Sequence, residues 1–214
     1  MKRIVAINAS PRTGWNTGIL VREAARGAES EGAEVEVIDL YKLDKFTGCI
    51  SCFGCKLPAH KGQCIYKDSL APVLEKIRHA DGLIVGTPNY LGDVTAGFRS
   101  LYERLIFQYL TYNKDQMNCN DRKIPVLFIM TSNASEDFYT EDGYGQVISK
   151  YQNTLNGFIG PTKVMICGNT LQVSDYSKYD WTMFDANAKK VRHEEIFPKE
   201  KEKAFHLGAE LVQE

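Results

Sequence analysis

The chain has 214 residues and a mass of 24.1 kDa, which is enough for one domain with a sizeable core. Hydrophobic residues make up 43% and charged residues 25%, and this composition excludes a disordered or fibrous protein. The formal net charge is −1, so we expect no binding of nucleic acid or of anionic membranes. The apolar stretches are too short for a membrane span and the N-terminus shows no signal-peptide pattern, so we expect a cytoplasmic protein.

Segments typical of buried strands alternate with segments typical of helices along the chain. The apolar segments predict strands at residues 4–9, 35–40, 82–87, 125–130 and 163–167. Helical spacing of apolar residues predicts helices at residues 17–30, 69–79, 95–109, 144–156 and 199–212. The segments between them include a cysteine loop at 45–67, a polar loop at 113–122 and an irregular insertion at 168–198. This alternation predicts a single α/β domain over residues 1–214, with a parallel sheet covered by helices on both faces.

The segment between the first predicted strand and helix has the composition of a phosphate-binding loop. Its polar and glycine residues are Ser10, Arg12, Asn16, Thr17 and Gly18. Free N–H groups and the positive dipole end at a helix N-terminus attract a phosphate, and hydroxyl groups add hydrogen bonds. The alternative is a simple helix cap, which needs only one such residue. The pattern matches neither the dinucleotide fingerprint nor the loop that binds nucleoside triphosphates.

A second polar loop follows the third predicted strand and consists of Thr87, Pro88, Asn89, Tyr90, Leu91 and Gly92. Pro88 and Gly92 shape the backbone so that main-chain N–H groups can approach the polar edge of a planar ring. Tyr90 or Leu91 can then cover one face of that ring. The alternative is an ordinary strand-to-helix loop. Ligands of such sheets bind beyond the carboxyl ends of the strands, so the two polar loops should share one site.

Four of the six cysteines fall within sixteen consecutive residues, and they are Cys49, Cys52, Cys55 and Cys64. A cytosolic thiol pool keeps cysteines reduced, so metal or redox chemistry explains this clustering better than disulfides do. The triplet spacing favours a [4Fe–4S] cluster over zinc, whose ligands come in more widely separated pairs. Free or redox-active thiols are a further alternative. Because the loop follows the second predicted strand, we expect the cysteines at the same sheet edge as the two polar loops.

These motifs resemble the flavodoxin-like NADPH-dependent FMN reductase family. The resemblance rests on residues 8–12 with Asn16 and Thr17, on residues 87–92, and on Glu103 and Arg104 in the following helix. The cysteine spacing is similar to that of the iron–sulfur flavoprotein branch. The resemblance implies a doubly wound, five-stranded sheet of order 2-1-3-4-5 and a non-covalently bound FMN. It also implies a third flavin contact near Thr131 and a homodimer or homotetramer.

From these features we expect an FMN-dependent oxidoreductase or electron-transfer flavoprotein. It would pass electrons between NAD(P)H or another donor and a small-molecule or protein acceptor, by way of a [4Fe–4S] cluster if the cysteines hold one. We expect no catalytic acid or base, because the chemistry belongs to the cofactor. The alternative is a non-enzymatic, flavodoxin-like electron carrier. The residues select neither NADH nor NADPH. The aromatic residues within 168–198 predict that this insertion covers the flavin or a neighbouring subunit.

Overall fold

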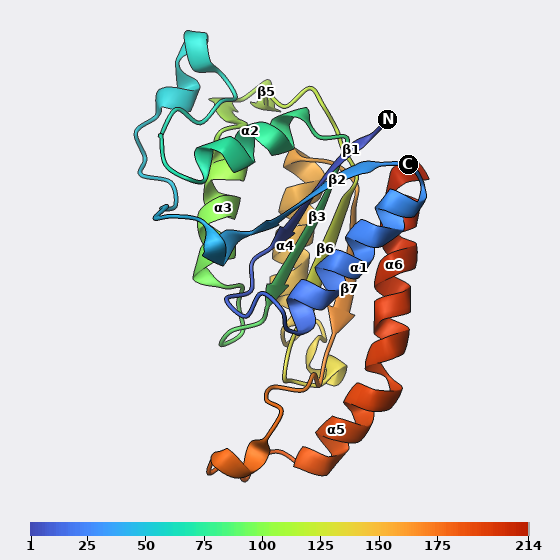
Figure 1. The fold of residues 1–214 in the computed structure, drawn as a ribbon. Helices are drawn as coiled ribbons and strands as arrows, with labels where there is room; N and C mark the ends of the chain where they lie inside the picture. The colour runs from blue at the N-terminus through green and yellow to red at the C-terminus, as the bar shows by residue number, and fades with distance from the viewer. Residues whose placement is uncertain (214) are drawn as a thin grey trace.

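A parallel sheet of five strands forms the centre of the computed structural model, which describes residues 1–213 (Figure 1). Its strands are β1 (Arg3–Asn8), β2 (Glu34–Asp39), β3 (Gly82–Pro88), β6 (Val126–Thr131) and β7 (Thr162–Cys167). They lie in the order β2-β1-β3-β6-β7, which confirms the predicted order 2-1-3-4-5 of the parallel strands. The strand order reverses between β1 and β3, and ligands of doubly wound sheets bind at such a point.

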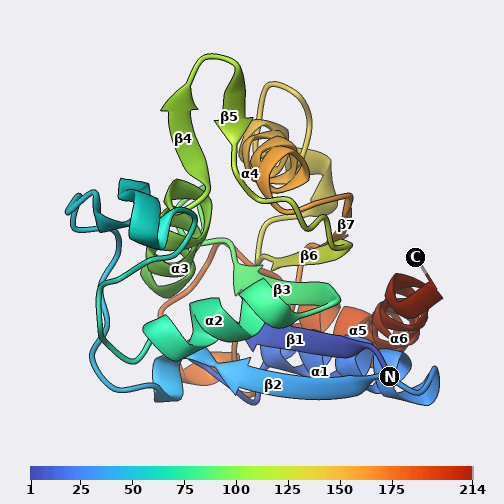
Figure 2. The same ribbon diagram turned by 90° about the horizontal axis from the view of Figure 1, so that it is seen from above.

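Successive side chains of the central strands face two separate hydrophobic layers. Figure 2 shows the helices that cover the two faces of the sheet. Val5 and Ile7 of β1 face the layer under α2 (Ala71–His79), α3 (Ala96–Phe107) and α4 (Gly145–Phe158). Ile4 and Ala6 face the layer under α1 (Asn16–Ser30) and α6 (Phe197–Gln213). Both faces of the sheet are therefore covered, and this explains why its strands read as continuous apolar runs in the sequence.

Helices α1 and α6 pack closely because each has a glycine at the contact. A Cβ atom on Gly27 would lie 1.8 Å from the carbonyl oxygen of Phe205, and one on Gly208 would lie 1.8 Å from that of Ala24. Neither position has room for a side chain unless the helices separate. This contact aligns α6 with α1, so the segment before α6 lies near the N-terminal end of α1 (Figure 1).

Two structured segments lie where the sequence predicted irregular structure. Strands β4 (Leu110–Asn113) and β5 (Gln116–Asn118) form an antiparallel hairpin in place of the predicted polar loop. Helix α5 (Ala186–Glu195) lies inside the insertion and buries only Lys189, so it has no apolar stripe that periodicity would reveal. Every other predicted helix and strand agrees with the structure to within two residues at each end.

Short 3₁₀ helices connect these elements at Leu40–Lys42, Gly54–Lys56, Pro58–His60, Glu136–Phe138 and Tyr176–Lys178. The insertion extends as a narrow arm below the sheet and returns through α5 to α6 (Figure 1). None of the helices formed by residues 1–213 combines the length and the apolar character that a membrane span requires.

Candidate functional site

The two polar loops meet at the carboxyl edge of the sheet, and Thr131 at the end of β6 connects them. Its Oγ1 atom lies 2.7 Å from Oγ1 of Thr17 in the first loop. Its carbonyl oxygen accepts a hydrogen bond of 2.7 Å from the N–H of Asn89 in the second loop. Thr95, which caps α3, donates from its hydroxyl to the carbonyl of Ala9 at 2.8 Å. The structure therefore brings both predicted loops and Thr131 together, at the point where the strand order reverses.

The N-terminus of α1 is buried and uncapped. Asn16 and Thr17 expose only 5% and 2% of their surface, and the side chain of Trp15 does not cap the helix. In the described chain, the N–H groups of residues 16–18 have no hydrogen-bond partner. A Cβ atom on Gly18 would lie 2.0 Å from the carbonyl oxygen of Thr13, so glycine permits this tight loop. Buried N–H groups without partners are costly, and a phosphate would satisfy them.

Two side chains predicted to bind the phosphate donate to the insertion instead. The guanidinium of Arg12 donates to the carbonyl of Gln172, and Nδ2 of Asn16 donates to the carbonyl of Leu171 at 2.7 Å. The hydroxyl of Ser10 accepts from the N–H of Arg12 at 3.2 Å. The donors of this loop that remain unpaired are thus main-chain N–H groups, and residues 171–172 hold the flanking side chains in place.

Three residues outside the predicted set of binding residues support this loop. Arg22 donates to both carboxylate oxygens of Asp39, at 2.9 and 2.8 Å. Asn8 donates to the same carboxylate at 2.8 Å and accepts from the N–H of Ser10 at 3.1 Å. Burial raises the pKa of Asp39, but hydrogen bonds from Asn8, Lys42 and Arg22 outweigh burial and hold the pKa below its usual value. The sequence offered one signal for Asn8 and Asp39: each is a polar residue at the end of a strand segment that is otherwise largely apolar.

The loop after β3 is a tight turn with an exposed tip. Tyr90 and Asp93 pair across the turn, and between them Leu91 and Gly92 have φ angles of 55° and 81°. Two positive φ angles define a type I′ turn, which a leucine adopts only rarely. Asn89 holds the turn by accepting the N–H of Gly92 at 2.9 Å. The side chain of Leu91 is fully exposed, so it is available to contact a ligand or a partner.

A pocket of about 810 Å³ opens beside this turn. Asn89 and Leu91 line it together with residues 132–135 after β6, and the insertion contributes residues 183–185, 188 and 189. Four of the six predicted ring-binding residues lie outside this lining, and they are Thr87, Pro88, Tyr90 and Gly92. Thr87 is buried and accepts from the N–H of Thr95 at 3.2 Å. Ligand pockets measure about 300–1,000 Å³, so this one has the size for a planar cofactor together with a small substrate.

The four clustered cysteines line one cavity of about 20 Å³ beside the C-terminal half of α3. Helix α3 holds both ends of the cysteine loop. The N–H of Cys64 donates to Oε1 of Gln108 at 3.1 Å, and the N–H of Cys49 donates to Oε2 of Glu103 at 3.3 Å. Within residues 1–213, no group of three or more histidine, cysteine or acidic side chains has the spacing of metal ligands. The cysteines therefore share a cavity without being drawn together as ligands.

The predicted position of the cysteines at the carboxyl edge is wrong. The chain after β2 runs along α3 to the C-terminal end of that helix, where Nζ of Lys56 donates to the carbonyls of Phe107 and Leu110 (Figure 1). The polar loop after β3 lies at the opposite end of α3, and a helix of 12 residues is about 18 Å long. The prediction placed the loop by its starting strand alone, but a segment of this length can cross the sheet.

Arg104 anchors the returning end of the cysteine loop. Its side chain is 1% exposed and donates to both oxygens of Asp68, at 2.6 and 2.7 Å. Its Nε lies 3.4 Å from Sγ of Cys64. Burial raises the pKa of Asp68, but the hydrogen bonds from Arg104 and from the N–H of Thr47 outweigh burial and keep the pKa below its usual value. The sequence signal for this buried ion pair was the position of Arg104, a charged residue on the apolar side of the helix 96–107.

One buried donor beside the cysteines has no partner. Nε2 of Gln108, which lines the cysteine cavity, makes no hydrogen bond in the described part of the chain. An unpaired amide N–H is costly when buried. Hydrogen bonds from N–H groups to sulfur atoms stabilise iron–sulfur clusters and tune their potentials. Four thiols with an unused N–H donor therefore form a suitable donor set for such a cluster.

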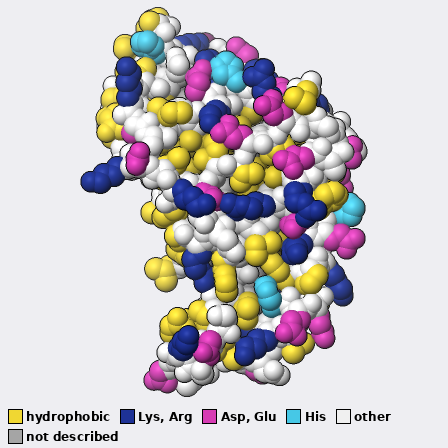
Figure 3. All heavy atoms as spheres, in the orientation of Figure 1, with side chains coloured by type: hydrophobic (Ala, Val, Ile, Leu, Met, Phe, Trp, Pro, Cys, Tyr) yellow, Lys and Arg dark blue, Asp and Glu magenta, His cyan; other side chains and the backbone are white. Residues whose placement is uncertain are grey.

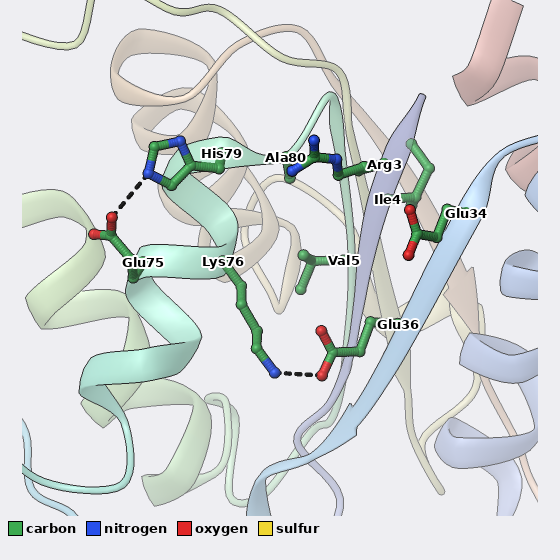
Figure 4. A pocket seen from close by; sticks show the side chains of 9 residues that line it. All are labelled: Arg3, Ile4, Val5, Glu34, Glu36, Glu75, Lys76, His79 and Ala80. Carbon is green, nitrogen blue, oxygen red and sulfur yellow. Dashed lines mark hydrogen bonds and ion pairs between the residues drawn. The ribbon is translucent and has the colours of Figure 1, made fainter. Parts of the chain in front are cut away.

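A further pocket, of about 310 Å³, lies between α2 and the first residues of β1 and β2 (Figure 4). Lys76 pairs there with Glu36, and His79 lies 2.8 Å from Glu75. Hydrogen bonds from Arg78 and His79 lower the pKa of Glu75 to about 2. The pocket lies at the amino edge of the sheet, away from both polar loops, so it is not part of this site.

Comparisons with known proteins identify the family of this chain and agree with its fold. The family model for NADPH-dependent FMN reductase matches residues 2–137. An iron–sulfur flavoprotein of Methanocaldococcus jannaschii is 38% identical over 102 residues, which make up 48% of this chain and 51% of the relative. One of Archaeoglobus fulgidus is 36% identical over 104 residues, which make up 48% of each chain. The match thus spans about half the length of these curated relatives.

Solved structures share the fold over nearly the whole chain. An NAD(P)H:quinone oxidoreductase from Methanothermobacter marburgensis has a TM-score of 0.72 at 14% identity, covering 98% of this chain and 96% of the other. An azoreductase from Bacillus anthracis has a TM-score of 0.68 at 15% identity, covering 98% and 100%. At such low identity these likenesses show the fold alone. The family model covers more than half of the chain, and the chain therefore belongs to the NADPH-dependent FMN reductase family, near its iron–sulfur flavoproteins.

Proposed function

We propose that the chain binds FMN at the carboxyl edge of its sheet. The observation that carries this proposal is the buried and uncapped N-terminus of α1, whose N–H groups at residues 16–18 would receive the phosphate. Ser10, Arg12, Thr17 and Gly18 would shape this anion site. The ring would lie against residues 87–92 and near Thr131, which joins the two loops. When bound, FMN supplies hydride acceptance and the release of electrons singly or in pairs.

On this basis the protein is an FMN-dependent oxidoreductase that passes electrons between NAD(P)H, or another donor, and an acceptor. Family membership supports this activity, and so does a pocket of about 810 Å³ that extends from the loop at residues 87–92 to the insertion. A pure electron carrier between proteins would need no such space for a small molecule. Steady NAD(P)H oxidation in the presence of an acceptor supports the enzyme, and its absence supports the carrier. The free thiols fit a cytoplasmic protein.

The cysteine cavity is the proposed site of a [4Fe–4S] cluster. Its support is the set of four thiols, the unpaired Nε2 of Gln108 and the relatives named iron–sulfur flavoproteins. Cys49, Cys52, Cys55 and Cys64 would ligate the cluster, with Arg104 fixing the position of Cys64. Burial raises the pKa of the Cys55 thiol and so favours its protonated form. The thiol would have to lose this proton when the cluster assembles.

The FMN proposal predicts different effects for two glycine substitutions in one loop. Gly18→Ala should weaken FMN binding at least tenfold, because its Cβ would push Thr13 out of the phosphate loop. Gly14→Ala should leave binding unchanged, since nothing lies within 4 Å of its Cβ. Fluorescence titration with FMN and with riboflavin provides the measurement. Equal affinity of the wild-type protein for FMN and riboflavin would refute the phosphate site.

The cluster proposal is tested by Cys52→Ala, at an exposed position where the substitution disturbs no packing. After anaerobic reconstitution, this variant should lose iron, sulfide and the associated absorbance but keep FMN, because the two sites lie at opposite ends of α3. Cys119→Ala, outside the four-cysteine set, is the matched control and should keep the cluster. One equivalent of zinc in the wild-type protein, or no iron in it, would contradict the proposal.

A further inference from the structure

Lys189 is a buried cation in the wall of the large pocket. It lies on α5 of the insertion and is 5% exposed. Its Nζ donates to the carbonyl of Asn133 at 2.8 Å and lies 5.6 Å from the centre of the Phe184 ring. One of its three N–H donors is therefore used within the chain.

No carboxylate neutralises this ammonium group in the described part of the chain. Asp185 caps α5 and lines the same pocket, and its Oδ1 accepts the N–H groups of Asn187 and Ala188, at 2.9 and 3.0 Å. Burial, together with the nearby Arg192, lowers the pKa of Lys189 to about 8. Burying a charge without a counter-ion costs free energy, and a bound anion would offset that cost.

The other residues around Lys189 describe the ligand that such an anion belongs to. Lys189 is the one Lys or Arg side chain among the described residues that line the pocket. Phe138, Tyr144 and Phe184 contribute aromatic surface to the same lining, and Leu91 adds the exposed tip of the loop at residues 87–92. Aromatic walls favour a flat, apolar ligand, while the single cation favours a negative group at one edge of it.

We infer that this pocket binds the electron acceptor as a planar aromatic molecule with an anionic substituent, and that Lys189 anchors the anion. This inference rests on the proposed function, because the acceptor would have to lie against the ring held by residues 87–92. With a sulfonated naphthoquinone as acceptor, NADH loses two electrons and one proton as hydride and becomes NAD⁺. The quinone takes the two electrons, that proton and one from water, and becomes the hydroquinone.

The direct test is calorimetric binding of 2-naphthoate and of neutral 2-naphthamide, which has nearly the same shape, to the purified FMN-bound protein. The wild-type protein should prefer the carboxylate about tenfold or more, because a hydrogen bond between two charged groups is stronger than one to a neutral amide. Lys189→Met should abolish this preference. Lys190→Met removes the same charge from an exposed neighbour and should keep it.

Equal binding of the two probes by the wild-type protein would overturn the inference without any variant. Loss of FMN affinity in Lys189→Met, with the naphthoate preference retained, would also overturn it, since Lys189 would then serve the cofactor. A kinetic arm compares a sulfonated with an unsulfonated naphthoquinone. Lys189→Met should raise KM about tenfold for the sulfonated acceptor alone. If the protein contains no FMN, the proposed function fails, but the naphthoate preference still tests the pocket.

Discussion

At the scale of single residues, the buried polar groups carry the information that the sequence did not. Arg104 and Asp68 are 1% and 9% exposed in their side chains and hold the cysteine loop against α3. The loop of residues 10–18 could be proposed as a phosphate site from the sequence because its residue types occur together before a helix. Arg104 was named only through the family resemblance, and Lys189 was not named at all, because the burial of a charged residue becomes clear only once its partner or pocket is known.

The first prediction concerns the contribution of Asp68 to stability and its loss at acid pH. Because the pKa of its carboxyl is lowered in the folded state, the charged form contributes stability above about pH 4, the value for an unfolded chain, and this contribution is lost as the pH falls further. Asp68→Asn should destabilise the protein by about 3 kcal/mol at pH 7, because it leaves Arg104 without its counter-charge. The difference in unfolding free energy between the variant and the wild-type protein should decrease as the pH falls from about 5 to 3.

Urea unfolding at a series of pH values measures this effect. Asp44→Asn, at an exposed carboxylate, is the control and should change the unfolding free energy little at any pH. If the difference in unfolding free energy between Asp68→Asn and the wild-type protein stays constant from about pH 7 to 3, the ion pair does not cause the loss of stability in acid.

At the scale of elements, the parallel strands were predictable because both faces of the sheet are covered. Burial on both faces produces uninterrupted apolar runs, and these fixed the five strands to within two residues. Helix α5 escaped prediction because it packs by hydrogen bonds and by one lysine, without an apolar face. The position of the cysteine loop escaped prediction because its contacts are with α3, far along the chain from β2.

The second prediction concerns the contact between α1 and α6. Gly208→Ala should lower the unfolding free energy by about 1–3 kcal/mol, because its Cβ would lie 1.8 Å from the carbonyl oxygen of Ala24. Gly157→Ala is the matched control near the end of α4, where nothing lies within 4 Å of the added Cβ. That variant should be equally stable or more stable by up to about 1 kcal/mol, since alanine favours a helix. Thermal unfolding of both variants decides whether close packing or glycine flexibility matters at this contact.

At the scale of the whole molecule, the insertion forms an arm with one attached side and one open side. Its attached side holds the phosphate loop through Leu171 and Gln172. Its open side presents Tyr179, Trp181 and Met183, which are 45%, 40% and 85% exposed. Figure 3 shows hydrophobic side chains at the surface of this arm, at the lower end of the molecule. Tyr179 and Trp181 stack at 4.3 Å between ring centres, so they form one continuous apolar surface. Continuous apolar surface of this kind is typical of contacts between subunits.

The last prediction follows from that open side, and it tests the proposed homodimer or homotetramer. With FMN bound, chymotrypsin should cut slowly near residues 176–184, because a second copy would cover these aromatic residues, and light scattering should give a multiple of 24.1 kDa. Met183→Glu would place a charge in the contact and should yield monomers that are cut rapidly there. Lys203→Glu changes an exposed residue of α6 and should behave as the wild-type protein does. Rapid cutting of the wild-type oligomer would mean that its subunits meet elsewhere, so that the arm covers only the site of its own chain.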